Sequence, residues 1–279
     1  MKNKFGKAKS GRGKSEHTNK HKLSVYSIID SVIKEADIIL EILDARFIEK
    51  TRNFELEKRI KILKKPLIYI LNKSDLINQE EIEKNLELED LKPRLFFSSK
   101  EGEKAGRELL MEMIEKEAEK IDSETVNIGI IGYPNTGKSS LINFLTGKHV
   151  SRTSPEAGHT HGIQKLKIGE GIYLIDTPGI IPIEEKSYGN SQLLAKHAQI
   201  GAITWDRTKN PEMVVHLIMK EYPGVLEKHY KINAERNSEI LLDTLGKRLH
   251  FLKKHGDVDD VRTAKQVLKD WQEGKIRQG

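Results

Sequence analysis

The residues best suited to chemistry form a loop with the sequence GYPNTGKS at positions 132–139. An apolar run, 126–131, precedes this loop, and a helix-like stretch, 139–145, follows it. In a strand, loop and helix context the glycines let backbone N–H groups surround phosphate oxygens, and the helix start adds a favourable dipole. Lys138 would contact the β- and γ-phosphates, and the Ser139 hydroxyl would bind Mg²⁺. We expect further nucleotide contacts from Asn135, Thr136, Gly137 and Ser140.

A second motif, DTPG at 176–179, follows the apolar run 172–175. That run indicates a buried strand, which places Asp176 at the C-terminal end of the strand. Such an aspartate can hold a Mg²⁺-bound water, and the backbone N–H of Gly179 can contact a γ-phosphate. By itself the motif is also compatible with an ordinary turn. The phosphate loop about forty residues earlier favours the nucleotide interpretation.

The choice of base depends on the sequence NKSD at 72–75, which ends the apolar run 66–71. The Asp75 carboxylate can accept hydrogen bonds from the ring N–H and the exocyclic amine of guanine, whereas adenine presents the opposite polarity. This discrimination is large because a mispaired buried carboxylate is left unsatisfied. The alternative is a solvated turn, for which these residue types are also typical. The guanine site would further include Asn72, Lys73 and a loop over the base, Ser98, Ser99 and Lys100.

The two elements occur in an unusual order, because the guanine motif precedes the phosphate loop and in ordinary GTPases it follows. In this order the chain resembles the circularly permuted GTPases, specifically the YlqF/RbgA-like group and its archaeal and eukaryotic relatives that act in ribosome assembly. The resemblance extends from about Lys22 onward and includes Asp44-Ala45-Arg46. The group usually has a proline soon afterwards, and this chain has the sequence FIE at 47–49 instead. We assign Asp44 and Arg46 no chemistry.

The resemblance also implies parts of a hydrolytic site. Thr160 matches the switch threonine that closes onto Mg²⁺ when the γ-phosphate is present, and Asn135 matches a residue found in potassium-using GTPases, although a structural turn residue is the alternative. Ile180 stands where signalling GTPases have the glutamine that orients water, so another group must do this. His21 lies at the position of a proposed catalytic histidine, but TNK replaces FPG at 18–20, and a tail histidine without a role is the alternative.

Apolar periodicity predicts the elements that position these residues. A helix is expected over 24–34, with further helices over 79–91 and 101–120. Between them, strands are expected at 38–43, 66–71, 94–97, 126–131, 164–168 and 172–175. The fold class is therefore α/β, a circularly permuted P-loop GTPase domain with a doubly wound, mostly parallel sheet, followed by a small all-helical domain. The expected domains are a basic tail at 1–22, the GTPase domain at 23–187 and the helical domain at 188–279.

The helical segment shows two apolar stripes at helical spacing. One stripe is Val261, Ala264, Leu268 and Trp271, and the other is Leu241, Leu245, Leu249 and Leu252, with Gly256 as the expected stop. We interpret both as the core of a small bundle, and His197 and Trp205 as packing residues. Basic residues lie beside the second stripe: Lys247, Arg248, Lys253 and Lys254. These residues could simply be solvated, but the resemblance implies that this domain binds rRNA.

Composition narrows the class of protein. The chain has 279 residues, a formal net charge of +6 and no cysteine, so no disulfide framework is possible. Residues 1–22 contain eight Lys or Arg and one acidic residue, Glu16, which accounts for the whole positive excess. Such a segment cannot bury enough apolar surface to fold alone, and its charge favours RNA as a partner, with a merely solubilising tail as the alternative. No apolar run is long enough for a membrane span, so we expect a soluble, cytoplasmic protein. The sequence leaves dimerisation open, and a monomer is the favoured oligomeric state.

Together these observations predict a GTPase that uses GTP/GDP, Mg²⁺ and K⁺. We expect its GTP-bound form to bind rRNA of the immature large ribosomal subunit and hydrolysis to release it. A different class of protein, a non-catalytic GTP-dependent RNA-binding scaffold, is the alternative. An ATP-using small-molecule kinase is disfavoured because it needs no guanine motif.

Overall fold

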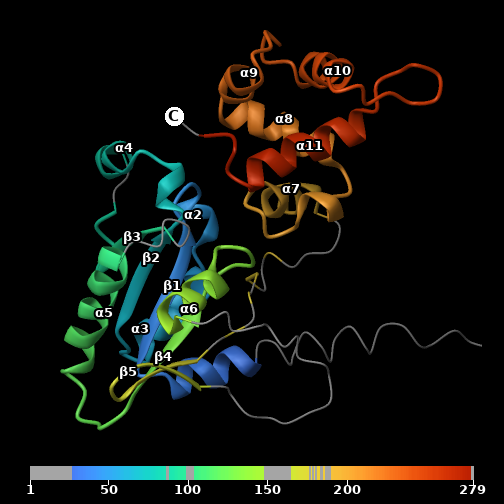
Figure 1. Ribbon diagram of the computed structural model, residues 1–279. Coiled ribbons are helices and arrows are strands. Elements are labelled where there is room, and N and C mark those ends of the chain that lie inside the picture. Colours follow the sequence, from blue (N-terminus) through green and yellow to red (C-terminus); the bar gives the residue numbers. More distant parts are fainter. Residues whose placement is uncertain are drawn as a thin grey trace, which may run out of the picture.

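The computed structural model describes residues 27–85, 88–98, 104–147, 165–175, 177, 179, 181–182, 185 and 190–277. These residues form a six-stranded sheet in the order β3-β2-β1-β4-β6-β5 (Figure 1). All neighbouring strands pair in parallel except β5, which pairs antiparallel with β6 at one edge. The strands are β1 Ile38–Asp44, β2 Leu67–Asn72, β3 Arg94–Phe97, β4 Val126–Ile131, β5 Lys165–Gly169 and β6 Ile172–Ile175. The predicted strands therefore agree with these within one residue at each end, with residue 164 outside the described chain.

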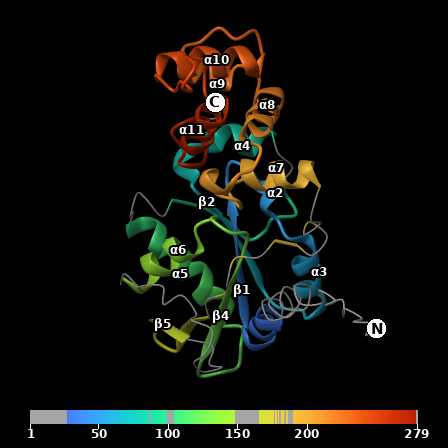
Figure 2. The same cartoon turned by 90° about the vertical axis from the view of Figure 1, so that its right-hand side faces the viewer.

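The central strand β1 has the sequence IILEILD, and every residue of it is buried. A parallel strand covered on both faces is expected to be almost continuously apolar. One face of the sheet packs against α5 (Lys104–Ala118) and α6 (Lys138–Thr146). The other face packs against α3 (Phe54–Ile62) and a helical stretch at 27–35. Figure 2 shows α5 and α6 on one side of β1 and α3 on the other, which confirms the doubly wound fold.

The helix predicted over 79–91 is too long. The helix α4 spans Gln79–Asn85, and residues 88–91 form a turn in which the backbone N–H of Leu91 donates to the carbonyl of Leu88 at 3.1 Å. Leu88 and Leu91 are buried against β1 and β2, which fixes the turn on the sheet.

Residues 190–277 form a second, helical unit beyond the C-terminal ends of β1 and β2 (Figure 1). Its helix α11 packs against α7, α8 and α10. The core of this helical unit includes Val215, Ile218, Leu241, Leu245 and Leu268. His197 is buried and Trp205 packs against the same core, so their interpretation as packing residues is confirmed. The elements are α7 Ser191–Gln199, η2 Trp205–Arg207, α8 Pro211–Glu221, α9 Val225–Tyr230, α10 Ser238–Arg248 and α11 Asp260–Gln272.

The two predicted stripes are correct only in part. In α11, Ala264, Leu268 and Trp271 are buried, but Val261 in the first turn is exposed. In the other stripe Leu249 and Leu252 are exposed, because α10 ends at Arg248 and the chain turns away. Val258 packs against α10 instead, beside Gly246. A Cβ on Gly246 would lie 2.3 Å from Cγ1 of Val258.

Gly256 is therefore not a helix stop. It lies in the turn of a short hairpin, in which Leu252 and Val258 form a bridge, and it has a φ of +91° that favours glycine. Among the described residues, no helix combines the length and the apolar character that crossing a bilayer would need.

Candidate nucleotide-binding site

The phosphate loop joins β4 to α6, as the sequence predicts. Two of its positions require glycine. Gly132 has a φ of +147°, and a Cβ there would lie 2.5 Å from the backbone oxygen of Ile42. Gly137 precedes α6 with a φ of +105°, and a Cβ there would lie 2.0 Å from the side-chain nitrogen of Asn72. The close approach of both neighbours explains why the loop cannot carry side chains at these positions.

Lys138 lies at the start of α6 and is buried. Its Nζ donates to the backbone oxygens of Gly132 at 3.0 Å and Tyr133 at 2.6 Å. The ammonium group is thus held inside the curve of the loop, where a phosphate would meet it. Gly179 lies against the same loop, because a Cβ on it would be 3.0 Å from Lys138 Nζ and 2.8 Å from the Cα of Pro134. This contact brings the end of the DTPG motif to the phosphate loop, as its proposed γ-phosphate role requires.

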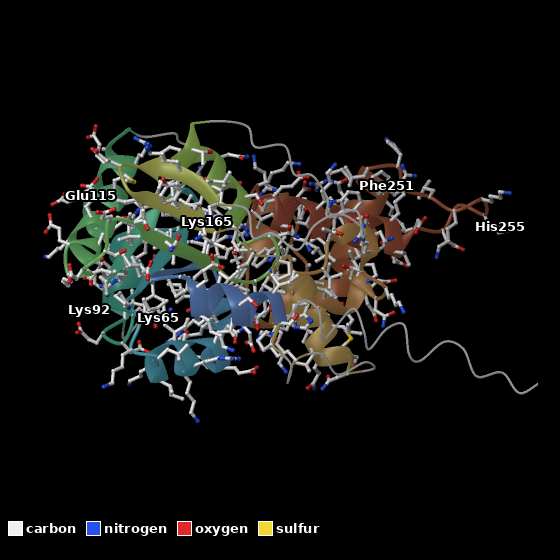
Figure 3. The ribbon with its side chains drawn as sticks, turned by 90° about the horizontal axis from the view of Figure 1, so that it is seen from below. Lys65, Lys92, Glu115, Lys165, Phe251 and His255 are labelled. Carbon is white, nitrogen blue, oxygen red and sulfur yellow. The ribbon has the colours of Figure 1, made fainter. Side chains whose placement is uncertain are left out.

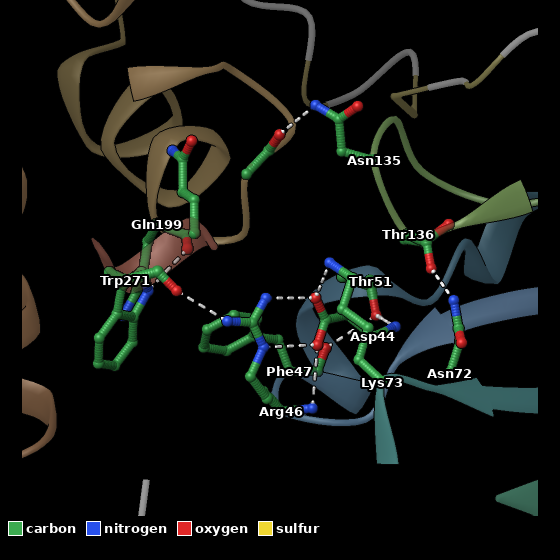
Figure 4. Close-up of polar contacts among 12 residues, drawn as sticks. Asp44, Arg46, Phe47, Thr51, Asn72, Lys73, Asn135, Thr136, Gln199 and Trp271 are labelled. Carbon is green, nitrogen blue, oxygen red and sulfur yellow. Dashed lines mark hydrogen bonds and ion pairs between the residues drawn. The ribbon is translucent and has the colours of Figure 1, made fainter. Parts of the chain in front are cut away.

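The guanine motif meets the phosphate loop through Asn72. This residue ends β2, is buried, and donates from Nδ2 to the backbone oxygen of Thr136 at 2.8 Å (Figure 4). The contact is possible because β2 and β4 are both parallel neighbours of β1, so their C-terminal ends lie at the same edge of the sheet. Chain order does not affect this proximity. The permuted sequence therefore assembles the same two loops that the ordinary order would.

Asp75, the predicted base reader, lies in the short helix η1, Ser74–Leu76. Its Oδ1 accepts a hydrogen bond from Ser98 Oγ at 2.8 Å, which orients the carboxylate. Lys73 directly precedes η1 and has a left-handed backbone conformation, with a φ of +64°. The structure thus brings together Asn72, Lys73, Asp75 and Ser98 as predicted.

Asp44 and Arg46, to which we assigned no chemistry, form a buried ion pair beside the guanine motif. The Asp44 carboxylate accepts hydrogen bonds from Arg46 Nε at 3.0 Å and Nη2 at 2.8 Å, and from Lys73 Nζ at 2.6 Å. Burial raises the pKa of Asp44, but Arg46 and Lys73 outweigh this effect and lower the pKa to about 2. Asp44 is therefore ionised at neutral pH. The signals in the sequence are the position of Asp44 at the end of a buried strand and the match of Asp44-Ala45-Arg46 to the family pattern.

The helical unit contacts the phosphate loop directly. Tyr133 is fully buried in the core of that unit, and Asn135 donates from Nδ2 to the backbone oxygen of Gly201 at 2.7 Å. Phe47, which departs from the usual motif, is buried in the same core with its ring centroid 5.8 Å from that of Trp271. Sequence reasoning missed these packing roles, because apolar periodicity does not report which distant helix a loop residue meets.

Ser139 is half-buried in the first turn of α6, and Ser140 is exposed beside it. Several predicted site residues lie outside the described chain, namely His21, Ser99, Lys100, Thr160 and Asp176. Over the described residues no group of three His, Asp or Glu side chains could hold a metal ion. Mg²⁺ in nucleotide sites is typically bound by one or two side chains together with phosphates and water, so the donor set proposed around Ser139 has the expected chemistry.

Comparison with known proteins agrees with this geometry. A family model described as 50S ribosome-binding GTPase matches residues 127–254. The chain is 37% identical over 259 residues to an uncharacterized GTP-binding protein of Methanocaldococcus jannaschii, covering 91% of this chain and 66% of that protein. It is 31% identical over 259 residues to nucleolar GTP-binding protein 2 of Saccharomyces cerevisiae, covering 90% of this chain and 51% of that protein. The chain thus spans about half to two thirds of the length of these relatives.

The fold has a solved counterpart. GNP-bound YlqF from T. maritima superimposes with a TM-score of 0.64 at 23% identity, covering 91% of this chain and 96% of that chain. Both the GTPase arrangement and the helical unit lie within this coverage. The similarity establishes a shared fold with the permuted element order.

Proposed function

This chain belongs to the circularly permuted GTPases, and from that premise we propose that it binds GTP and GDP, hydrolyses GTP, and acts in the cytoplasm as a monomeric assembly factor on the immature large ribosomal subunit. The contact between Asn72 Nδ2 and the Thr136 backbone oxygen carries the nucleotide part of this proposal. It joins a base-reading motif to a phosphate loop although the two are far apart, and in reversed order, in the sequence. One nucleotide could therefore place its base at Asp75 and its phosphates at Lys138.

The side chains have defined roles in this proposal. Asp75, oriented by Ser98, would accept hydrogen bonds from guanine, and Lys138 would neutralise charge on the β- and γ-phosphates. Mg²⁺, when bound, would neutralise negative charge that develops on the phosphates. Its proposed ligands are Ser139, Thr160 and, through water, Asp176.

Hydrolysis needs a group that replaces the absent glutamine at Ile180. We propose that Asn135 holds a K⁺ ion, which would supply positive charge near the phosphates. The Nδ2 group of Asn135 donates to Gly201, so its oxygen is directed away from that carbonyl (Figure 4). This orientation supports a ligand role for the oxygen. His21 is a candidate for positioning water.

The proposed partner is rRNA of the large subunit. The names of the matching family and of the nucleolar relatives support an association with ribosomes. Four basic residues on the helical unit are exposed, and two of them lie in the hairpin between Phe251 and His255, which extends away from the sheet (Figure 3). These residues are Lys247, Arg248, Lys253 and Lys254. Their exposure and charge favour contact with phosphate.

Co-sedimentation with ribosomal subunits tests the proposal. With a non-hydrolysable GTP analogue and Mg²⁺, the protein should pellet with large subunits, and with GTP it should be released as phosphate appears. Equal pelleting with the analogue and with GDP would contradict GTP-dependent binding. Pelleting and release without phosphate production would instead favour the non-catalytic scaffold.

A further inference from the structure

We propose that Asp44 and Arg46 are positioning residues for the guanine site, which hold Lys73 in place and make nucleotide affinity depend on docking of the helical unit. This inference rests on the proposed binding of guanine nucleotides. It concerns residues that take no part in the motifs that recognise base or phosphate.

The Asp44 carboxylate organises the end of two neighbouring strands. Asp44 pairs in register with Asn72, and the backbone N–H of Ala45 donates to the Asn72 oxygen at 2.8 Å. Its Oδ2 accepts from Lys73 Nζ at 2.6 Å, while its Oδ1 accepts from the backbone N–H of Arg46 at 3.1 Å. Lys73 is thereby held beside β1 in the left-handed backbone conformation that places it between Asn72 and Asp75. Loss of this anchor would free the lysine that should lie along the base.

Arg46 extends the cluster to the helical unit. Two of its nitrogens bind Asp44, and the third, Nη1, donates to the backbone oxygen of Trp271 at 2.9 Å. Trp271 lies in the last turn of α11. The chain just beyond it packs on Leu76, the residue that follows the guanine motif, because a Cβ on Gly274 would lie 2.5 Å from a side-chain carbon of Leu76. One guanidinium thus connects the base-reading loop to the helical unit.

The same helical unit also contacts the phosphate loop. Trp271 Nε1 donates to the Gln199 oxygen at 3.0 Å, and Gln272 Nε2 donates to the Ala198 oxygen at 2.6 Å. Two residues after Gln199, the Gly201 oxygen accepts from Asn135 at 2.7 Å. Figure 4 shows the contact between Trp271 and Gln199 and the hydrogen bond that Asn135 donates.

A nucleotide that binds both loops should therefore favour the arrangement in which the helical unit keeps these contacts. By thermodynamic linkage, docking of the unit must then favour nucleotide to the same degree.

A purely structural ion pair would stabilise the fold without affecting the nucleotide. Arg52 provides the matched control. The relative solvent exposure of Arg46 and of Arg52 is 7% each, and each guanidinium binds at least one carboxylate. The partners of Arg52 are Glu49, Glu57 and Asp90. These three residues are in neither nucleotide loop and not in the helical unit.

The test compares Arg46→Lys with Arg52→Lys in the full chain. Lysine keeps the charge but lacks the planar fork, so it cannot bind Asp44 and reach Trp271 together. With fluorescent GDP and a fluorescent GTP analogue, we expect Arg46→Lys to weaken binding about tenfold. Arg52→Lys should lower the melting temperature to a similar degree and leave both affinities within about twofold.

A second readout is amide hydrogen exchange. Nucleotide should slow exchange at 191–203 and 260–272 in the parent and in Arg52→Lys, and this slowing should be lost in Arg46→Lys. If Arg46→Lys does not fold, Asp44→Asn with Arg46→Met removes the pair without leaving a buried charge, and the same losses are expected.

Unchanged affinity in the folded Arg46 variant, or an equal loss in Arg52→Lys, would overturn the inference. Failure of the parent to bind guanine nucleotide would instead overturn the proposed function, and this inference with it.

Discussion

At the scale of single residues, the proposed guanine site makes Asp75 the residue that should decide which base is accepted. Replacing Asp75 with Asn should weaken GDP binding about 100-fold, because the amide opposes the guanine amine with a donor. The same amide matches the added carbonyl of xanthine, so XDP should become the preferred ligand. Competition binding with GDP, XDP and ADP measures the change, and the exposed Asp122→Asn serves as the control. Equal competition by ATP and GTP for the parent protein would refute the guanine assignment.

Glu41 is the residue whose charge opposes the fold. It lies in the centre of β1, fully buried, and its Oε1 accepts from the backbone N–H of Asn53 at 3.0 Å. Burial raises its pKa well above the ordinary value, and the nearby Glu57 raises it further. In the unfolded chain Glu41 ionises at its ordinary pKa. The unfolded state therefore loses its proton first, and stability falls as pH rises from the ordinary pKa toward the folded-state pKa.

Glu41→Gln should remove this dependence while keeping the acceptor for Asn53. Relative to the parent, the free energy of unfolding of the variant should increase by up to about 1.4 kcal/mol per pH unit across that window. Urea unfolding at a series of pH values measures the difference. The exposed Glu115→Gln should follow the parent. Parallel curves for parent and Glu41→Gln would show that Glu41 is accommodated as a carboxylate.

At the scale of elements, the phosphate loop is the part that should respond to monovalent cations. If Asn135 holds K⁺, GTP turnover should be several-fold faster in KCl than in NaCl at equal ionic strength, because the ion adds charge stabilisation. Asn135→Ala should bring the ratio of the two rates to about one. The ratio of the KCl rate to the NaCl rate is taken within each variant. It therefore separates the effect of the ion from the effect of losing the Asn135–Gly201 hydrogen bond. A potassium preference that survives in Asn135→Ala would assign the ion to other ligands.

The elements also show what sequence can predict. Buried parallel strands and the two nucleotide motifs depend on local composition and spacing, so β1 to β6 and the places of both motifs at strand ends could be anticipated. The early end of α10 could not, because it follows from Val258 packing beside Gly246. The Asp44 ion pair was missed for a related reason. Its partners lie just beyond the ends of β1 and β2 and in α11, and only tertiary structure brings Lys73 and Trp271 to it.

At the scale of the whole molecule, two basic regions should act differently on RNA. Deleting residues 1–20 removes seven Lys or Arg, so binding to the large subunit should weaken and its salt dependence become shallower. Neutralising Lys247, Arg248, Lys253 and Lys254 should instead abolish the preference for one subunit, because a folded surface can match RNA shape. Subunit pelleting at several salt concentrations measures both effects.

Nucleotide affinity should stay unchanged in both of these variants. A control that neutralises four exposed lysines of the GTPase domain, Lys58, Lys61, Lys64 and Lys116, should keep the subunit preference. If the helical variant binds both subunits as the parent does, the RNA contact lies elsewhere on the protein.

The burial of Phe47 and Tyr133 in the helical core has a consequence for modularity. Both aromatic side chains come from the GTPase half of the chain, so the helical segment alone would lack two of its own interior residues. Its remaining apolar surface would face water at that position, which disfavours autonomous folding. The helical segment is therefore a poor candidate for transplantation onto another protein, because its core would have to be completed by two residues from elsewhere in the chain.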